Sequence, residues 1–246
     1  MAGDLRVLSG GDGDPLLLLL HGLGATADVW AGWQPMLADR WPGRWLAPDL
    51  PGHGGSAPLP KYTFDDLAAA VRPLVAPGGR TVVLGHSLGG VVGLALAAAG
   101  APVAALVGLG IKVAWTDEEL AKAQALAERP VTWFGSRDEA AARHLRVSGL
   151  AGLLGADDPA VTAGLVREDD RWRLALDPRA FGVGAPDMAD LVTRAEPAKV
   201  TLARGEFDPM NSDEQLGQWG VPVVTLPGLG HNAHVESPER CLTLLG

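Results

Sequence analysis

Short apolar runs bounded by turn residues recur along the chain and predict buried strands. The clearest is Leu16–Leu20, which follows Pro15 and ends at His21-Gly22. Continuous runs of this kind are typical of strands that are covered on both faces of a sheet. Similar runs lie at residues 45–47, 81–84, 103–107, 200–203 and 223–226, and residues 5–8 predict an antiparallel edge strand.

Helix-length segments alternate with several of these strands. Thr63, with Asp66 three residues later, predicts the N-cap of a helix that runs to Val71, and residues 90–99 predict a helix that ends at Gly100. Ser237 and Pro238 predict the cap and first residue of a short final helix. Alternation of strands and helices is typical of an α/β protein with a mostly parallel central sheet flanked by helices.

A long insertion interrupts this alternation after the run at 103–107, which we count as the sixth major strand. Residues 108–199 are far more than a parallel crossover needs. Thr116 with Glu119 and Ser136 with Glu139 have capping-box spacing, which predicts helices over 117–128 and 137–145. The run 157–159 predicts a further turn or helix start.

We interpret this insertion as a small helical lid over the carboxyl ends of the strands, because ligands of open α/β sheets bind at those ends. An extension of the core on another face is the alternative. The predicted domains are a core of residues 1–112 and 199–246 and a lid of residues 113–198.

Composition narrows the class of protein. Apolar residues make up 47% of the chain and the formal net charge is −9, which fits a globular domain and argues against a nucleic-acid partner. The single cysteine, Cys241, cannot form an internal disulfide, so we expect a cytoplasmic protein. No signal-peptide pattern or membrane-spanning run is visible, so we expect no membrane partner. A monomer and a homodimer both remain open.

The segment Gly85-His86-Ser87-Leu88-Gly89 is a G-x-S-x-G motif between a predicted strand and a predicted helix. That context is typical of a sharp turn that holds a nucleophilic serine above the sheet. The turn requires an unusual backbone conformation at Ser87 and little bulk two residues to either side, which Gly85 and Gly89 satisfy. The alternative is a glycine-rich turn that contains an ordinary serine.

A serine nucleophile needs a base, and the base needs a carboxylate that orients it. The run at 200–203 leads to Glu206 and Asp208, and the run at 223–226 leads to His231, with His234 three residues later. We prefer His231 to His234 because of its position on the loop, and Glu206 and Asp208 both remain candidates for the acid. His231 and His234 also suggest a metal site, but no third ligand is recognisable nearby.

With these residues assembled, the chain resembles the α/β-hydrolase fold superfamily along nearly its whole length, as a serine hydrolase with a small helical lid. The matching segments are 21–24, 49–54, 85–90, 205–208, 230–231 and 236–238. The resemblance implies Ser87 as nucleophile, His231 as general base and then acid, and Asp208 as its orienting acid. It also implies an oxyanion hole formed by the backbone N–H groups of Leu23 and Leu88.

The resemblance implies an enzyme that cleaves a carboxylic ester, a lactone or a thioester of a small molecule through an acyl-enzyme, without a metal or organic cofactor. A serine at the turn argues against dehalogenase and epoxide hydrolase chemistry, for which relatives use an aspartate. Two alternatives remain: a carbon–carbon bond hydrolase of β-diketone-like substrates and a non-catalytic ligand-binding protein on the same fold.

The other histidines and the tryptophans have simpler interpretations. We expect His21 to brace the loop of the oxyanion hole, and Asp49 and His53 to satisfy backbone groups of a turn. The sequence assigns no role to His86 and places His144 on a solvated helix face. Trp133 and Phe134 either face a substrate from the lid or pack in a core.

Overall fold

A seven-stranded sheet forms the centre of the protein. The computed structural model describes residues 4–75 and 77–246. The strands lie in the spatial order β1-β3-β2-β4-β5-β8-β9. They are β1 (Val7–Gly10), β2 (Leu16–Leu20), β3 (Trp45–Pro48), β4 (Thr81–His86), β5 (Val103–Leu109), β8 (Lys199–Gly205) and β9 (Val223–Leu226).

The direction of the strands confirms the predicted sheet. β1 pairs antiparallel with β3, whereas the pairs β2·β3, β2·β4, β4·β5, β5·β8 and β8·β9 are all parallel. The edge strand begins at Val7 rather than at residue 5. In a parallel sheet the carboxyl ends of the strands share one edge, so the loops after β4, β8 and β9 meet there.

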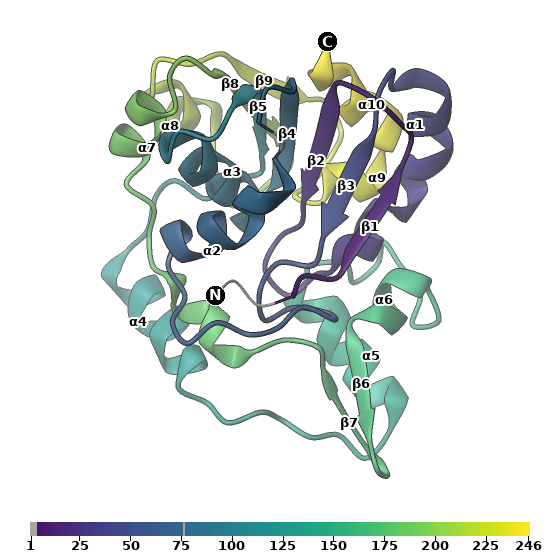
Figure 1. Ribbon diagram of the computed structural model, residues 1–246. Helices are drawn as coiled ribbons and strands as arrows, with labels where there is room; N and C mark the ends of the chain where they lie inside the picture. The colour runs from purple at the N-terminus through teal and green to yellow at the C-terminus, as the bar shows by residue number, and fades with distance from the viewer. Residues whose placement is uncertain (1–3, 76) are drawn as a thin grey trace.

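Alternating side chains of β2 divide the core into two layers. Leu18 and Leu20 pack on one face of the sheet, and Leu17 and Leu19 pack on the other. Helices α2 (Phe64–Val71), α3 (Leu88–Ala98), α7 (Met188–Arg194) and α8 (Asp213–Gly217) contribute to the first layer. The second layer contains residues of η1 (Ala27–Trp33), α1 (Gln34–Arg40), α9 (Ala233–Glu236) and α10 (Pro238–Leu242), on the opposite side of the sheet in Figure 1.

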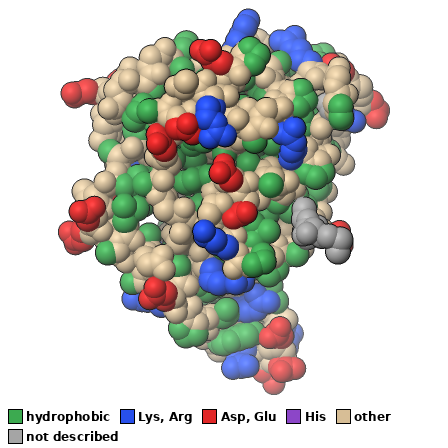
Figure 2. Space-filling model, turned by 60° about the vertical axis from the view of Figure 1, so that its left-hand side comes forward, with side chains coloured by type: hydrophobic (Ala, Val, Ile, Leu, Met, Phe, Trp, Pro, Cys, Tyr) green, Lys and Arg blue, Asp and Glu red, His purple; other side chains and the backbone are tan. Residues whose placement is uncertain are grey.

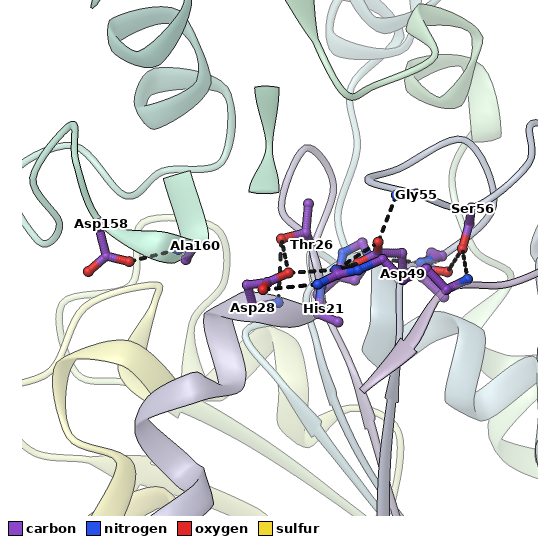
Figure 3. Close-up of polar contacts among 11 residues, drawn as sticks. His21, Thr26, Asp28, Asp49, Gly55, Ser56, Asp158 and Ala160 are labelled. Carbon is purple, nitrogen blue, oxygen red and sulfur yellow. Dashed lines mark hydrogen bonds and ion pairs between the residues drawn. The ribbon is translucent and has the colours of Figure 1, made fainter. Parts of the chain in front are cut away.

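Side-chain hydrogen bonds cap the first turn of four helices that the sequence predicts. The Thr63 hydroxyl accepts a hydrogen bond from the N–H of Asp66, and Thr116 and Glu119 form a complete capping box before α4 (Asp117–Ala127). Ser136 caps α5 (Arg137–Val147). Asp158 caps α6 (Pro159–Ala163) through the N–H of Ala160, as Figure 3 shows. The helix α10 begins at Pro238 as predicted, but the Ser237 side chain makes no capping hydrogen bond.

The insertion lies between β5 and β8, at one end of the sheet (Figure 1). The strand that precedes it is the fifth along the chain, one fewer than the sequence count. The insertion is also not wholly helical, because β6 (Leu165–Glu168) pairs antiparallel with β7 (Arg171–Leu174). The turn between them places Asp169 at φ 52°. The Asp169-Asp170 pair at the turn was the sequence signal for this hairpin.

The end of the insertion returns to the sheet through α7. Met188 and Leu191 of this helix belong to the same apolar layer as α3. The domain boundaries at 112/113 and 198/199 stay a prediction. None of the helices in the described residues is long and apolar enough to cross a membrane.

His144 contradicts the expectation of a solvated face. Its side chain is buried in the insertion, and a Cβ at Gly164 would collide with its ring. Burial lowers the pKa of His144 to about 4, because the charged imidazolium loses its hydration. The neighbouring residues Arg143 and Arg146 suggested solvent, but the His144 ring packs against Gly164, the residue before β6.

Candidate active site

The turn between β4 and α3 holds Ser87 in a strained backbone conformation. Its φ is 49° and its ψ is −116°, and its N–H donates a hydrogen bond to the carbonyl oxygen of Leu109 at 2.8 Å. A Cβ at Gly85 would collide with the carbonyl oxygen of Gly89, and a Cβ at Gly89 would collide with that of Leu20. The two glycines therefore allow the turn to approach β2 and its own helix.

Substitution Gly89→Ala should destabilise the fold by about 1–3 kcal/mol, because the new methyl group meets backbone atoms that cannot move independently. The matched control is Gly217→Ala at the exposed last residue of α8, where a Cβ meets nothing within 4 Å. Thermal unfolding followed by circular dichroism measures both. Equal melting temperatures for the two variants would contradict the steric account.

His231 and Asp208 form a direct pair on the loops after β9 and β8. The distances from His231 Nδ1 to the two carboxylate oxygens of Asp208 are 3.0 and 3.1 Å. A carboxylate only accepts hydrogen bonds, so Nδ1 carries a proton and Nε2 of the neutral ring is free to accept one. The Asp208 side chain is fully buried and that of His231 is 21% exposed.

Hydrogen bonds from the side chains of Arg204 and Asn211 hold the loop that carries Asp208. The Arg204 guanidinium donates to the carbonyl oxygen of Asp208 at 3.1 Å and to Oδ1 of Asn211 at 2.9 Å. The Asn211 amide in turn donates to the carbonyl oxygen of Ile111 at 2.8 Å. Gly110, with φ 66°, lies where a Cβ would be 3.1 Å from Asp208 Oδ2. These contacts thus join the loops after β5 and β8 around the carboxylate of Asp208.

Ser87 and His231 line the same cavity, which has a volume of about 490 Å³. Leu23 and Leu88 line it as well. Leu88 is the first residue of α3, where backbone N–H groups have no partner within the helix. No hydrogen bond joins the Ser87 hydroxyl to His231 in the described part of the chain. Such bonds are often long before substrate binds.

The competing residues lie elsewhere. Glu206 is exposed, and its carboxylate accepts a hydrogen bond from the N–H of Gly228 at 2.7 Å. His234 is buried behind His86, with 4.1 Å between the ring centroids, and it does not line the cavity. Among residues 4–75 and 77–246, no group of three or more His, Cys, Asp or Glu side chains is placed to hold a metal ion.

His86 contacts the backbone of His231, which the sequence did not suggest. Its Nε2 donates to the carbonyl oxygen of His231 at 3.0 Å, and the two ring centroids are 4.7 Å apart. Burial holds the pKa of His86 well below its usual range, so the ring stays neutral. His86 therefore supports the loop of His231.

His21 braces the loop that contains Leu23, as the sequence predicts. Its Nε2 accepts a hydrogen bond from the N–H of Leu50, and its Nδ1 donates to the carbonyl oxygen of Gly22, both at 2.8 Å. The ring therefore joins the loop after β2 to the loop after β3.

Asp49 organises the same loops from inside the turn. Its carboxylate accepts from the N–H groups of Ala27 at 2.7 Å and Gly55 at 2.8 Å (Figure 3). Arg6 of the segment before β1 bridges Asp28 and Asp49 at 2.6 and 3.0 Å. His53 Nδ1 donates to the carbonyl oxygen of Pro51. Asp49 and His53 thus satisfy turn backbone, as expected.

Phe64, Trp115 and Phe181 form the aromatic walls of the cavity. Trp133 instead lies under Arg171, whose guanidinium carbon is 4.5 Å from the centroid of the ring. Phe134 exchanges backbone hydrogen bonds with Trp172. Neither Trp133 nor Phe134 lines the cavity, and both are half-buried outside the two core layers, so neither alternative describes them.

Comparison with known proteins identifies the family. Residues 17–244 match the family described as "Alpha/beta hydrolase family". The chain belongs to the alpha/beta hydrolase family. This hydrolase is 30% identical over 258 aligned residues to the 2-succinyl-6-hydroxy-2,4-cyclohexadiene-1-carboxylate synthase of Serratia proteamaculans, an alignment that covers 95% of the chain and 93% of the relative.

Solved structures agree with the family. The structure of E-2-(acetamidomethylene)succinate hydrolase superimposes on this hydrolase with a TM-score of 0.80 and 25% identity, over 98% of this chain and 92% of the other. An esterase of Mycobacterium tuberculosis superimposes with a TM-score of 0.76 and 25% identity, over 99% of this chain and 88% of the other. The predicted fold class is confirmed, and the protein is an enzyme of the hydrolase type.

Proposed function

We propose that this hydrolase cleaves a carboxylic ester through an acyl-enzyme, with Ser87 as nucleophile, His231 as general base and acid, and Asp208 as the orienting acid. The observation that carries the proposal is the hydrogen-bonded pair of His231 and Asp208 beside the cavity that also contains Ser87. The strained backbone at Ser87 supports it, because such strain persists only where the surrounding structure enforces it.

The proposed reaction has two halves. The Ser87 hydroxyl oxygen attacks the ester carbonyl carbon while His231 Nε2 accepts the proton. The tetrahedral intermediate collapses, and His231 returns that proton to the leaving alcohol. Water then attacks the acyl-enzyme, with His231 again as base, and releases the acid and free Ser87. Asp208 stabilises the imidazolium that forms in each half.

Two backbone donors complete the proposed site. The N–H groups of Leu23 and Leu88 bind the oxyanion of each tetrahedral intermediate. Loss of one such donor typically costs about 10²- to 10³-fold in kcat. The contacts of His21 with Leu50 and Gly22 keep the Leu23 donor in place, because they fix the loop from both sides.

A fluorophosphonate probe tests this proposal directly. We expect one probe per chain at neutral pH, attached to the peptide that contains Ser87, because only an activated serine attacks phosphorus at a useful rate. Mass spectrometry of digested protein locates the adduct. Ser148, which lines the same cavity, is the internal control and should stay unmodified. A folded protein that remains unlabelled would favour a non-catalytic binding protein.

Carbon–carbon bond hydrolysis remains the second candidate, because the relative from Serratia proteamaculans is named as a synthase, so ester cleavage is not common to all relatives of this chain. The same labelled serine would serve either reaction. A panel of p-nitrophenyl esters, thioesters, lactones and β-diketones separates them. The ester proposal requires that an ester, thioester or lactone has a higher kcat/KM than any β-diketone.

A further inference from the structure

Basic side chains gather at the cavity of an otherwise acidic chain. Lys112, Lys122 and Arg146 line it, and Glu119 is the one carboxylate among its lining residues. The whole chain has a net charge of −9, and Figure 2 shows acidic and basic side chains interspersed over one face of the molecule. The positive charge at the cavity is therefore not part of a generally basic protein.

The one carboxylate that lines the cavity is engaged in contacts within the protein. Glu119 Oε1 lies 2.8 Å from Lys112 Nζ, and Oε2 accepts a hydrogen bond from the N–H of Thr116 at 2.9 Å. The second contact is half of the capping box of α4, where the helix dipole also favours a negative charge. The pair of Glu119 and Lys112 is therefore close to neutral.

Lys122 and Arg146 supply the positive charge that remains. Lys122 lies on the face of α4 formed by residues 119, 122, 123 and 126, all of which line the cavity at helical spacing. Arg146 lies in the last turn of α5. Both side chains are exposed, and neither forms an ion pair within the described residues. Their charges are available to a ligand.

The negative charge of the site is kept away from the opening. Asp208 is fully buried behind His231 and is not among the residues that line the cavity. The aromatic and aliphatic walls formed by Trp115, Phe181 and Leu126 reduce the local dielectric and so strengthen the field of the two cations in the cavity.

We propose that the substrate of this hydrolase carries a carboxylate in addition to the bond that Ser87 attacks, and that Lys122 and Arg146 bind this carboxylate. The inference rests on the proposed function, since it assigns the substrate class of the same site. A flexible lysine and a planar guanidinium at the rim attract an anion and orient it through charge-assisted hydrogen bonds.

The test compares esters that differ only in one charge. The first pair is the monoanionic 4-nitrophenyl glutarate and its neutral methyl ester. The second pair is the butyrate ester of 4-hydroxybenzoate and the butyrate ester of methyl 4-hydroxybenzoate. The first pair places the charge on the acyl side and the second on the leaving side. We expect the charged member of at least one pair to have the higher kcat/KM, with a preference that weakens as salt rises from 20 to 500 mM.

Variants assign the preference to the two side chains. Lys122→Gln and Arg146→Gln should each lower the ratio of kcat/KM for the charged ester to that for the neutral ester by about two- to five-fold, and the double variant by about ten-fold. Lys199→Gln is the matched control: Lys199 is exposed at the start of β8, at the opposite end of the strand from the cavity. It should leave the ratio unchanged.

The outcomes separate the two proposals. In the first outcome, Ser87 is labelled and the neutral esters are hydrolysed, but neither pair shows a preference for the charged ester, or the ratio of kcat/KM for the charged and neutral esters is unchanged in both variants. The carboxylate inference is then overturned and the proposed function stands. If Ser87 is unlabelled and no ester is hydrolysed, both are overturned, because the carboxylate is defined relative to the bond that Ser87 attacks.

Discussion

Substitution Ser87→Ala should reduce kcat for an activated ester by about 10⁴- to 10⁶-fold while the protein stays folded. The substitution removes only the hydroxyl group, and alanine adopts the backbone conformation of the turn at no greater cost than serine. The remaining activity would come from the oxyanion donors and from substrate binding. Stopped assays with p-nitrophenyl butyrate measure the loss, and circular dichroism confirms the fold.

Ser148→Ala is the matched control for this experiment. Ser148 also lines the cavity, but its hydroxyl donates to the carbonyl oxygen of His144 within the last turn of α5. We expect kcat within about three-fold of wild type, since one local hydrogen bond contributes only about 1 kcal/mol to stability. Asp208→Asn should fall between the two variants, with a loss of about 10⁴-fold, because an amide can hold His231 in the wrong tautomer. Comparable losses in both serine variants would contradict the assignment of Ser87.

Mild acid should destabilise the protein already above the pH at which carboxylates titrate. Burial lowers the pKa of His53 and of His234 to about 3, and that of His144 to about 4. The pKa values of His21 and His86 are lowered for the same reason. All five rings are therefore neutral in the folded protein at pH values where an exposed histidine is charged.

The direction of the effect follows from proton uptake. Above pH 6.5 folded and unfolded chains both hold neutral histidines, so the full stability is present. Below pH 6.5 the unfolded chain binds protons that the folded protein cannot, and each buried histidine lowers the free energy of unfolding by about 1.4 kcal/mol per pH unit. His53, His144 and His234 alone give a loss of roughly 4 kcal/mol per pH unit, against a total of about 5–15 kcal/mol for a typical protein.

We therefore expect the melting temperature to fall by roughly 10 °C per pH unit between pH 5.5 and 4.5. Scanning calorimetry across pH 7.5 to 4.5 measures the slope. His144→Leu should reduce the slope by the contribution of one proton, because its Nε2 has no hydrogen-bond partner in the described residues and its ring lies in the insertion, away from Ser87. A melting temperature that stays constant from pH 7 to 5 would contradict the burial of these rings as neutral groups.

The sequence predicted the sheet and the residues at its carboxyl edge because both depend on local signals. The apolar runs mark strands that are buried on two faces, and chain order then assigns Ser87, Asp208 and His231 to three loops at one edge. That order left Glu206 open as the acid, and the resemblance to the α/β-hydrolase fold favoured Asp208, whose carboxylate lies 3.0 Å from His231 Nδ1. The strained turn at Ser87 could be foreseen from the flanking glycines.

The insertion was less predictable because its contacts are made between distant segments. His144 has charged neighbours in sequence, yet its ring packs against Gly164. Trp133 is a residue type that often contacts substrates, yet its ring lies beneath the Arg171 guanidinium. The hairpin β6–β7 has only four residues in each strand, too few to establish a period of two without knowledge of the partner. The helical spacing of residues 119, 122, 123 and 126 identifies them as one face of α4, but it does not show that this face lines the cavity.

The bond network of Arg204, Asn211 and Ile111 has a consequence for how such enzymes diversify. It joins Ile111, just after the point where the insertion leaves the sheet, to the loop after β8 that carries Asp208. The insertion rejoins the sheet at Lys199, at the other end of β8, so these contacts do not involve the chain in between. A recombination event that replaces the chain between Ile111 and Lys199 would change the selectivity of the cavity and leave the contacts around Asp208 in place. We expect chimaeras whose first junction lies after Ile111 to retain turnover, and chimaeras that also replace Gly110 and Ile111 to lose it.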